Sequence, residues 1–293
     1  MYFVRRTFVV FALAVSVLFQ AVAQDAQTFA LAFKPGFAYE LTLTSLNMSE
    51  FSEGTMAMES VEVYALKVDE AKPDGAAKVT ATLKKATMRG RAPWFDCETD
   101  EAVAMLSSAG NSTHNKSFTF TLSADGQIGE MAGAESIREG IDASFKKSIG
   151  EPVNEELVSV SMLFAGWLKP NVIQYQLLAA FHGHRTEPTK LGEGWTIEDQ
   201  THEYVKADLK RTFLFDSIAQ SQWRLKVSGG GSGDAGHDIT CKEVCEGEIK
   251  LNRETNWPEE IKITVNMDQT YKDNGEPREA KAVNEFTVIG KKL

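Results

Sequence analysis

Apolar residues recur at every second position along most of this chain, and this spacing constrains its fold more than any other feature. Side chains of a β-strand alternate between the two faces of a sheet, so each run predicts a strand with one apolar and one polar face. Two-faced strands are typical of antiparallel sheets, since parallel sheets are buried on both faces. The alternating apolar residues are Phe37, Tyr39, Leu41 and Leu43; Val61, Val63 and Ala65; Val79, Ala81 and Leu83; Phe118, Phe120 and Leu122; Phe213 and Phe215; Trp223, Leu225 and Val227; Ile249 and Leu251; Ile261, Ile263, Val265 and Met267; Phe286 and Val288.

Turn residues separate these runs and favour a meander of long strands. Asp-Gly and Asn-Gly steps supply the positive φ angles that tight hairpins require. The glycine-rich stretch from Gly229 to Asp234 is interpreted as an exposed flexible loop. The turn signals are Lys34-Pro35-Gly36, Pro73-Asp74-Gly75, Ala124-Asp125-Gly126-Gln127 and Asp273-Asn274-Gly275.

The middle of the chain changes to a helical period. Residues 136–139 read as a capping box, followed by apolar residues at every fourth position up to Phe145. Pro152 can occupy the first position of a second helix, which we expect over residues 153–168. This helix is apolar around much of its circumference, so we expect it to be the most buried element. Residues 171–181 form a third, weaker helical pattern.

These patterns together predict an α+β fold. We expect a large, curved, half-barrel-like antiparallel sheet, with two or three mid-chain helices packed on its concave apolar face. A single β-rich domain over residues 24–293, with a helical insert at about residues 134–183, accounts for every predicted element.

The N-terminus has the features of a signal peptide over residues 1–23. Arg5 and Arg6 precede an uncharged apolar run, and Ala21-Val22-Ala23 forms a small-x-small cleavage site. The run is shorter than the roughly 20 apolar residues of a membrane-spanning helix, and no later segment is longer. We therefore expect an exported bacterial protein, periplasmic or secreted, without a membrane span.

The charge argues against one class of partner. The formal charge is −10, and loss of Arg5 and Arg6 with the signal peptide would make it −12. An acidic surface repels phosphate backbones, so nucleic acid is not an expected partner.

Two short motifs flank the helical region. The first is Leu122-Ser-Ala-Asp-Gly-Gln-Ile128 leading to Gly133, and the second is Pro188-Thr-Lys-Leu-Gly192-Glu-Gly-Trp195. With the strands that follow, through Gly247-Glu-Ile-Lys-Leu251, this order resembles a family of exported bacterial proteins of unknown function. The family implies no activity or catalytic residue, and Cys97 departs from its pattern, which has serine there. The order is also similar, more distantly, to the half-barrel of LolA-type lipoprotein carriers.

Three cysteines remain after export, and a disulfide among Cys97, Cys241 and Cys245 is one interpretation. Along a straight strand Cys241 and Cys245 would lie about 13 Å apart, beyond the roughly 7 Å limit between disulfide Cα atoms. They can pair only across a sharp turn, and otherwise Cys97 pairs with one of them. The alternative is that all three are small buried hydrophobic residues.

No motif indicates catalysis, a metal or a cofactor. His182 and His184 supply at most one edge of a zinc site, which needs three or four ligands. Cys97 follows Asp96 but lacks the signature of a nucleophile. We therefore expect a non-enzymatic protein without a cofactor.

Six aromatic residues surround the predicted helices. They are expected to form either an ordinary core or the lining of an apolar cavity for a lipid or acyl chain. The first arrangement favours a structural or protein-interaction module of the cell envelope with a filled core, and the second a protein that binds an apolar ligand. The six residues are Phe118, Phe120, Phe145, Phe164, Trp167 and Phe181.

Overall fold

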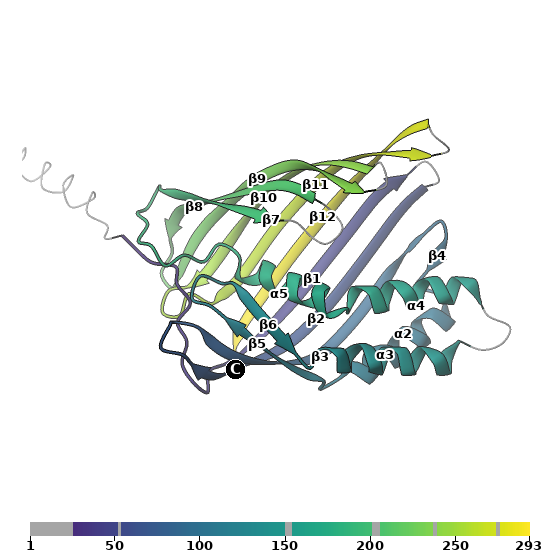
Figure 1. The fold of residues 1–293 in the computed structure, drawn as a ribbon, viewed down its shortest axis with the longest axis horizontal. Helices are drawn as coiled ribbons and strands as arrows, with labels where there is room; N and C mark the ends of the chain where they lie inside the picture. Colours follow the sequence, from purple (N-terminus) through teal and green to yellow (C-terminus); the bar gives the residue numbers. More distant parts are fainter. Residues whose placement is uncertain (1–25, 52–53, 150–153, 201–205, 237–238, 274–275) are drawn as a thin grey trace, which may run out of the picture.

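The computed structural model describes residues 26–51, 54–149, 154–200, 206–236, 239–273 and 276–293, and its main feature is one large antiparallel sheet (Figure 1). The predicted signal peptide and Pro152 lie outside the described residues. Strands follow the order β6-β5-β3-β2-β1-β12-β11-β10-β9-β8-β7, with β4 paired to β3. The strands are β1 Ala38–Phe51, β2 Gly54–Ala71, β3 Ala77–Ala92, β4 Phe95–Asp96, β5 Ser117–Leu122, β6 Ile128–Ala132, β7 Gly194–Gln200, β8 Lys206–Ile218, β9 Gln222–Gly236, β10 Ile239–Asn252, β11 Pro258–Asp273 and β12 Glu276–Lys292.

The predicted α+β fold with a curved antiparallel sheet is confirmed. The sheet does not close into a barrel, because β6 and β7 each pair on only one side within the described chain. Gly36, Gly75 and Gly126 have φ angles of 81°, 85° and 85°, as the turn signals predict. The first strand, β1, and the last strand, β12, lie side by side at the centre of the sheet, where Leu43 pairs with Val288.

Four helices occur among the described residues and lie on the concave side of the sheet (Figure 1). Three of them, α2, α4 and α5, contact strands of the sheet, and α3 packs against α2 and α4. Helices α3, α4 and α5 fall within residues 134–183, where the sequence places the helical insert. None of the described helices is long and apolar enough to span a membrane. The helices are α2 Asp100–Thr113, α3 Glu135–Ser148, α4 Glu155–Trp167 and α5 Pro170–Phe181.

Two helix starts differ from the sequence predictions. Helix α2 was not predicted, although Thr99 caps it by accepting a hydrogen bond from Ala102 N at 3.2 Å. The predicted capping box of α3 is wrong, because its N-cap is Ala134, which has no side-chain oxygen. Ser136 instead donates to the carbonyl oxygen of Gly133 at 2.9 Å, which a serine inside the first turn can reach.

The glycine-rich stretch is part of strand β9 and not a flexible loop. A Cβ atom on Gly229 would lie 2.1 Å from the carbonyl oxygen of Lys210 in β8. One on Gly230 would lie 2.3 Å from the carbonyl oxygen of Glu243 in β10. Glycine is therefore needed because the two neighbouring strands approach the β9 backbone closely.

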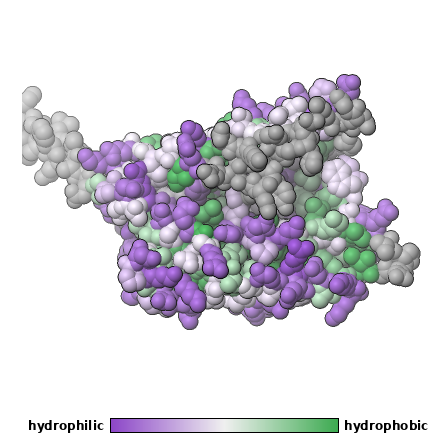
Figure 2. All heavy atoms as spheres, in the orientation of Figure 1, coloured by the Kyte–Doolittle hydropathy of each residue, from purple (hydrophilic) through white to green (hydrophobic). Residues whose placement is uncertain are grey.

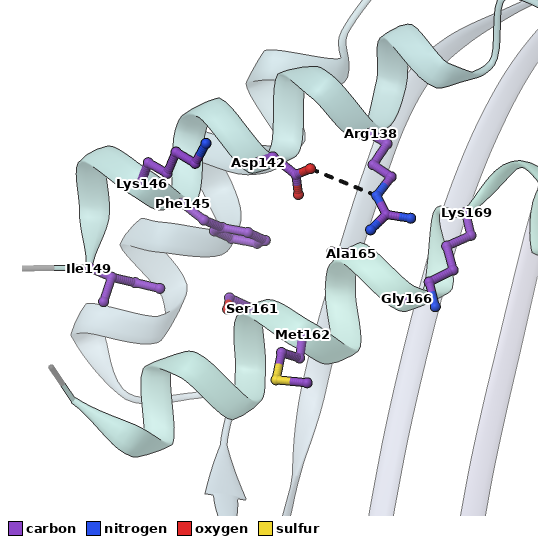
Figure 3. Close-up of a pocket in the computed structure, with 10 residues that line it drawn as sticks. All are labelled: Arg138, Asp142, Phe145, Lys146, Ile149, Ser161, Met162, Ala165, Gly166 and Lys169. Carbon is purple, nitrogen blue, oxygen red and sulfur yellow. Dashed lines mark ion pairs between the residues drawn. The ribbon is translucent and has the colours of Figure 1, made fainter.

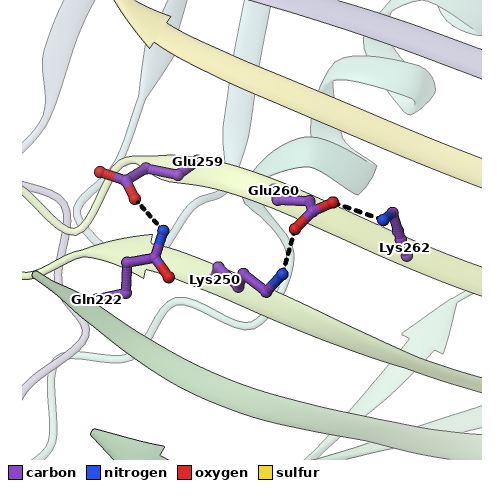
Figure 4. A network of polar contacts seen from close by, with 5 residues as sticks. All are labelled: Gln222, Lys250, Glu259, Glu260 and Lys262. Atoms are coloured by element: carbon purple, nitrogen blue, oxygen red, sulfur yellow. Dashed lines mark hydrogen bonds and ion pairs between the residues drawn. The ribbon is translucent and has the colours of Figure 1, made fainter. Parts of the chain in front are cut away.

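The convex face carries cross-strand polar contacts (Figure 4). Glu260 of β11 lies between Lys250 of β10, which donates to it, and Lys262, whose Nζ is 2.6 Å away. Hydrogen bonds from Lys250 and Lys262 lower the pKa of Glu260. Beside them, Gln222 donates to Glu259 at 2.6 Å and so ties β9 to β11. These contacts fix the register at a solvated face and leave the apolar side chains to the other face.

Candidate functional site

One end of the concave face, the closed end, is filled by the N-terminal segment, which is the described chain before β1, residues 26–37. Trp257 is fully buried and donates from Nε1 to the carbonyl oxygen of Ala32 at 3.1 Å. Asn256 donates to the carbonyl oxygens of Thr28 and Ala30 at 3.2 and 2.7 Å. These bonds satisfy the backbone of a segment that is in no regular sheet, and they hold it across the ends of the strands.

Aromatic rings fill the closed end behind this segment. Phe29 is fully buried and stacks on Trp195 with ring centroids 5.4 Å apart. It also meets Phe215 and Trp223 edge to face. Such pairs each add about 0.5–1.5 kcal/mol beyond the burial of apolar area. The closed end is therefore a solid, strongly stabilised plug.

The opposite, open end of the concave face differs in its side chains and its cover. The far ends of β1, β2, β11 and β12 extend beyond the helices (Figure 1). Nine side chains there point to the same side as the buried core residues of their strands, but they are only half-buried. We call this set the trough: Ser45, Asn47, Met56, Met58, Ser60, Val265, Met267, Asn284 and Phe286.

The trough is built by cross-strand register. Asn47 pairs with Met58 on one side and with Asn284 on the other, and Asn284 in turn pairs with Val265. Asn47 donates to Asn284, and Ser49 donates to Asn47 at 3.0 Å. The centre of the trough is thus a polar line, flanked by methionine and valine side chains. Methionine is flexible and polarizable, so it adapts to apolar partners of different shape.

A buried carboxyl group lies where the trough meets the helices. Glu62 of β2 is 1% exposed and accepts a hydrogen bond from the hydroxyl of Tyr64. Burial raises the pKa of Glu62 to about 8, against the lowering effect of the hydrogen bond from Tyr64 and of the Gln176 and Trp167 side chains. Trp167 Nε1 is itself buried without a regular hydrogen bond among the described residues. Glu62 is therefore protonated at neutral pH and links β2 to α4 and α5 as a neutral group.

A second buried polar group lies on the β8 side of the concave face. Arg211 of β8 is 7% exposed, and its Nη2 lies 3.7 Å from Glu243 of β10. Its Nη1 lies 3.4 Å from Nδ1 of His182, which follows α5. An ion pair this enclosed needs its partners in place, because a lone buried charge is strongly destabilising.

The structure separates the six predicted aromatic residues into packed groups. Phe118 and Phe120 lie side by side on β5, and Phe164 of α4 contacts both Phe145 and Trp167. Phe181 lies apart, against Trp257 at the closed end. All except Trp167 are at most 6% exposed. Among the described cavities, only the groove between α3 and α4 is lined by any of them, and that residue is Phe145.

All three cysteines are present as thiols. Cys241 and Cys245 share the inward side of β10, and Cys97 follows β4 near α2. Burial, with the nearby carboxylates of Asp96 and Glu98, raises the pKa of the Cys97 thiol to about 11, which opposes a role as a nucleophile.

The histidine pair is occupied by protein contacts. His184 Nδ1 lies 2.6 Å from the carbonyl oxygen of Phe181, and its Nε2 lies 2.8 Å from that of Asn256. Burial lowers the pKa of His184 against these two carbonyls. Over the described ranges, no group of three or more His, Cys, Asp or Glu side chains could hold a metal ion.

Sequence reasoning missed Glu62 because it assigned β2 to the wrong face. Val61, Val63 and Ala65 were expected to face the core, yet they lie on the convex face and are half-buried. Tyr64, Leu66 and Val68 carry an equally apolar pattern one residue out of phase, and they are the buried set. That second pattern was the available signal.

A family model described as a family of unknown function, DUF6263, matches residues 74–258. No curated protein matches the chain in sequence. Lipovitellin, solved for its lipid–protein interactions, has 11% identity and a TM-score of 0.42 over 89% of this chain, which spans only 25% of the lipovitellin chain.

Two further solved structures have lower TM-scores. DynF, from the dynemicin biosynthesis pathway of Micromonospora chersina, has 9% identity and a TM-score of 0.26, covering 92% of this chain and 86% of its own. An outer-membrane channel from Pseudomonas putida F1 has 9% identity and a TM-score of 0.22, covering 89% of this chain and 98% of its own. TM-scores in this range establish no shared fold and no shared function.

Proposed function

The chain belongs to the DUF6263 family of unknown function, as its sequence pattern predicted, and we propose that it is a non-enzymatic protein that binds an apolar ligand on its concave face. The ligand class we propose is a lipid or other molecule with an acyl chain. The observation that carries this proposal is the trough, a half-buried, largely apolar surface at the open end of a sheet whose other end is plugged.

The composition of the trough fits such a ligand. Five of its nine side chains are apolar, and three of these are methionines. Ligand sites are typically apolar surfaces with a few polar groups that fix orientation. Asn47 and Asn284 supply those groups at the centre of the trough.

A binding role suits the buried polar groups better than catalysis does. Glu62 has the most perturbed pKa of the described carboxyl groups, but it is enclosed beneath α4 and α5. A general acid or base must come within hydrogen-bond reach of its substrate. Glu62 is therefore assigned to holding the helices against the sheet.

Export to the bacterial periplasm or exterior is part of the same proposal. It rests on the basic residues Arg5 and Arg6, the apolar run after them and the Ala21-Val22-Ala23 step. A protein outside the cytoplasm is well placed to bind lipids or other envelope molecules.

One alternative has support of its own. The predicted aromatic residues are packed tightly, as in an envelope protein with a filled core and no ligand, and such a protein would use its edge strands β6 and β7 for contacts with partners. The two functions differ in whether anything occupies the trough.

Native mass spectrometry of the protein purified from its own host, followed by lipid extraction, distinguishes them. We expect a co-purified lipid in the native protein and its loss when Val265 in the trough is changed to lysine. Val244→Lys is the matched control, because Val244 is 52% exposed on the convex face. Recovery of the protein without any bound molecule, also after incubation with envelope lipids, would favour the alternative.

A further inference from the structure

We propose that the groove between α3 and α4 is a second ligand site, which takes a single-chain anionic amphiphile of the fatty-acid type. The groove has a volume of about 600 Å³, is lined by side chains of α3, α4 and the residues that follow them, and shares no lining residue with the trough (Figure 3). This is within the size range of ligand sites, roughly 300–1,000 Å³. The site is independent of the proposed function of the concave face.

The first observation is an apolar surface on a helix that was expected to be buried. Helix α4 was predicted to be the most buried element, yet Met162 is 69% exposed. Its apolar outer side faces α3 across the groove, whose floor also contains Phe145, Ile149 and Ala165. Hydrophobic spheres are visible at this end of the molecule (Figure 2). An exposed apolar groove with a polar rim is typical of a binding site.

The second observation is the charge of the rim. Three cations line the groove, Arg138, Lys146 and Lys169, against the single carboxylate of Asp142. This local excess of positive charge occurs on a chain with a formal charge of −10. The rim therefore attracts an anion that the rest of the surface would repel.

The cations are available to a ligand. Arg138 contacts Asp142 through Nε at 3.7 Å, and both side chains are about half exposed, so this pair is weak. Lys169 forms no ion pair within the part of the chain that the structure describes. Guanidinium and ammonium groups are the common protein ligands of carboxylates.

Charge and apolar surface are distributed along the groove in a way that orients the ligand. Arg138 and Lys169 lie at one end and Ile149 lies at the other, with Phe145 and Met162 between them; the third cation, Lys146, lies beside Phe145 on the Ile149 side (Figure 3). A carboxylate between Arg138 and Lys169 would place its chain over Phe145 and Met162. This polarity, and a volume suited to one chain, favour a single amphiphile over a membrane surface.

The probe is dodecanoate below its micellar concentration, titrated into the full-length mature protein by calorimetry at low and high salt. Dodecanol is the uncharged comparison, and vesicles of anionic phospholipid test the membrane as an alternative source. We expect dodecanoate to bind about tenfold or more tightly than dodecanol at low salt, with the difference shrinking at high salt. Lys169→Glu should weaken dodecanoate about tenfold or more and leave dodecanol nearly unchanged.

Two further variants separate this groove from the trough. Met162→Asp should weaken both probes, whereas Lys190→Glu, an exposed lysine outside the groove, should change neither. Val265→Lys in the trough should leave the charge-dependent dodecanoate site intact. Equal dodecanoate affinity in wild type and Lys169→Glu, binding to vesicles only, or loss of the site in Val265→Lys alone would each overturn the proposal. Met162 and Lys190 are exposed, whereas Lys169 and Val265 are partly buried, so circular dichroism verifies the fold of each variant.

Discussion

Replacing Glu62 with glutamine should change how the stability of the protein depends on pH. The pKa of Glu62 is raised from 4.5 to about 8 by burial. Below pH 4.5 the carboxyl group is protonated in both the folded and the unfolded chain, so burying it costs no ionisation free energy and the protein has its full stability. As the pH rises, the unfolded chain ionises first, and stability falls until the pH passes the folded-state value near 8.

The size of the effect follows from the shift. One pKa unit corresponds to about 1.4 kcal/mol, so the shift of Glu62 corresponds to about 5 kcal/mol of stability lost between acid and alkaline pH. Glutamine has nearly the same shape, accepts the hydrogen bond of Tyr64 and does not ionise. The variant should therefore be close to wild type at pH 4.5 and several kcal/mol more stable at pH 9.

Urea unfolding at pH 4.5, 7 and 9, followed by tryptophan fluorescence, measures this difference. Glu50→Gln is the control, because Glu50 is an exposed carboxylate on the opposite face of neighbouring β1. The reasoning is refuted if the stability difference between Glu62→Gln and wild type stays constant within about 1 kcal/mol across the pH range.

Three other predictions test the packing. Gly229→Ala should lower the free energy of unfolding by about 3 kcal/mol or more, because its Cβ would lie 2.1 Å from Lys210 O. Gly166→Ala, with open space around it, should instead stabilise α4 by about 0.5–1 kcal/mol, and urea titration measures both effects. Trp257→Ala should lower the stability measured by thermal unfolding by about 3–5 kcal/mol. The control Trp94→Ala, at a side chain that is 48% exposed, should lower it by about 1 kcal/mol or less, and equal losses would contradict the closed-end plug. Cys97, with a thiol pKa of about 11, should react with iodoacetamide at pH 8 only after unfolding, and rapid labelling of the native protein by mass spectrometry would show the site to be open.

The sheet could be predicted from the sequence because its strands obey one physical rule. Residues such as Leu41, Leu225 and Ile261 alternate with polar neighbours, and each is at most 1% exposed. The tight turns at Gly75 and Gly126 need positive φ angles, and the Asp-Gly steps in the sequence predict them.

Other features depend on tertiary contacts that no local pattern reports. The β9 glycines were predicted to form a loop, because the close approach of β8 and β10 that requires glycine there exists only in the assembled sheet. Helix α4 was predicted to be the most buried element because it is apolar around much of its circumference. The sequence does not tell which side of such a helix the sheet covers. The trough was not predicted either, since half-burial of Met58 or Val265 depends on where the helices end.

The central claim is that the trough binds an apolar molecule, and the most direct test is the affinity of a neutral apolar probe, N-phenyl-1-naphthylamine, measured by its fluorescence. Wild type and the convex-face variant Val244→Lys should bind the probe with the same affinity, and Val265→Lys should bind it about tenfold or more weakly, since a lysine there places a charge in the apolar site. Equal probe binding by all three proteins would contradict the claim.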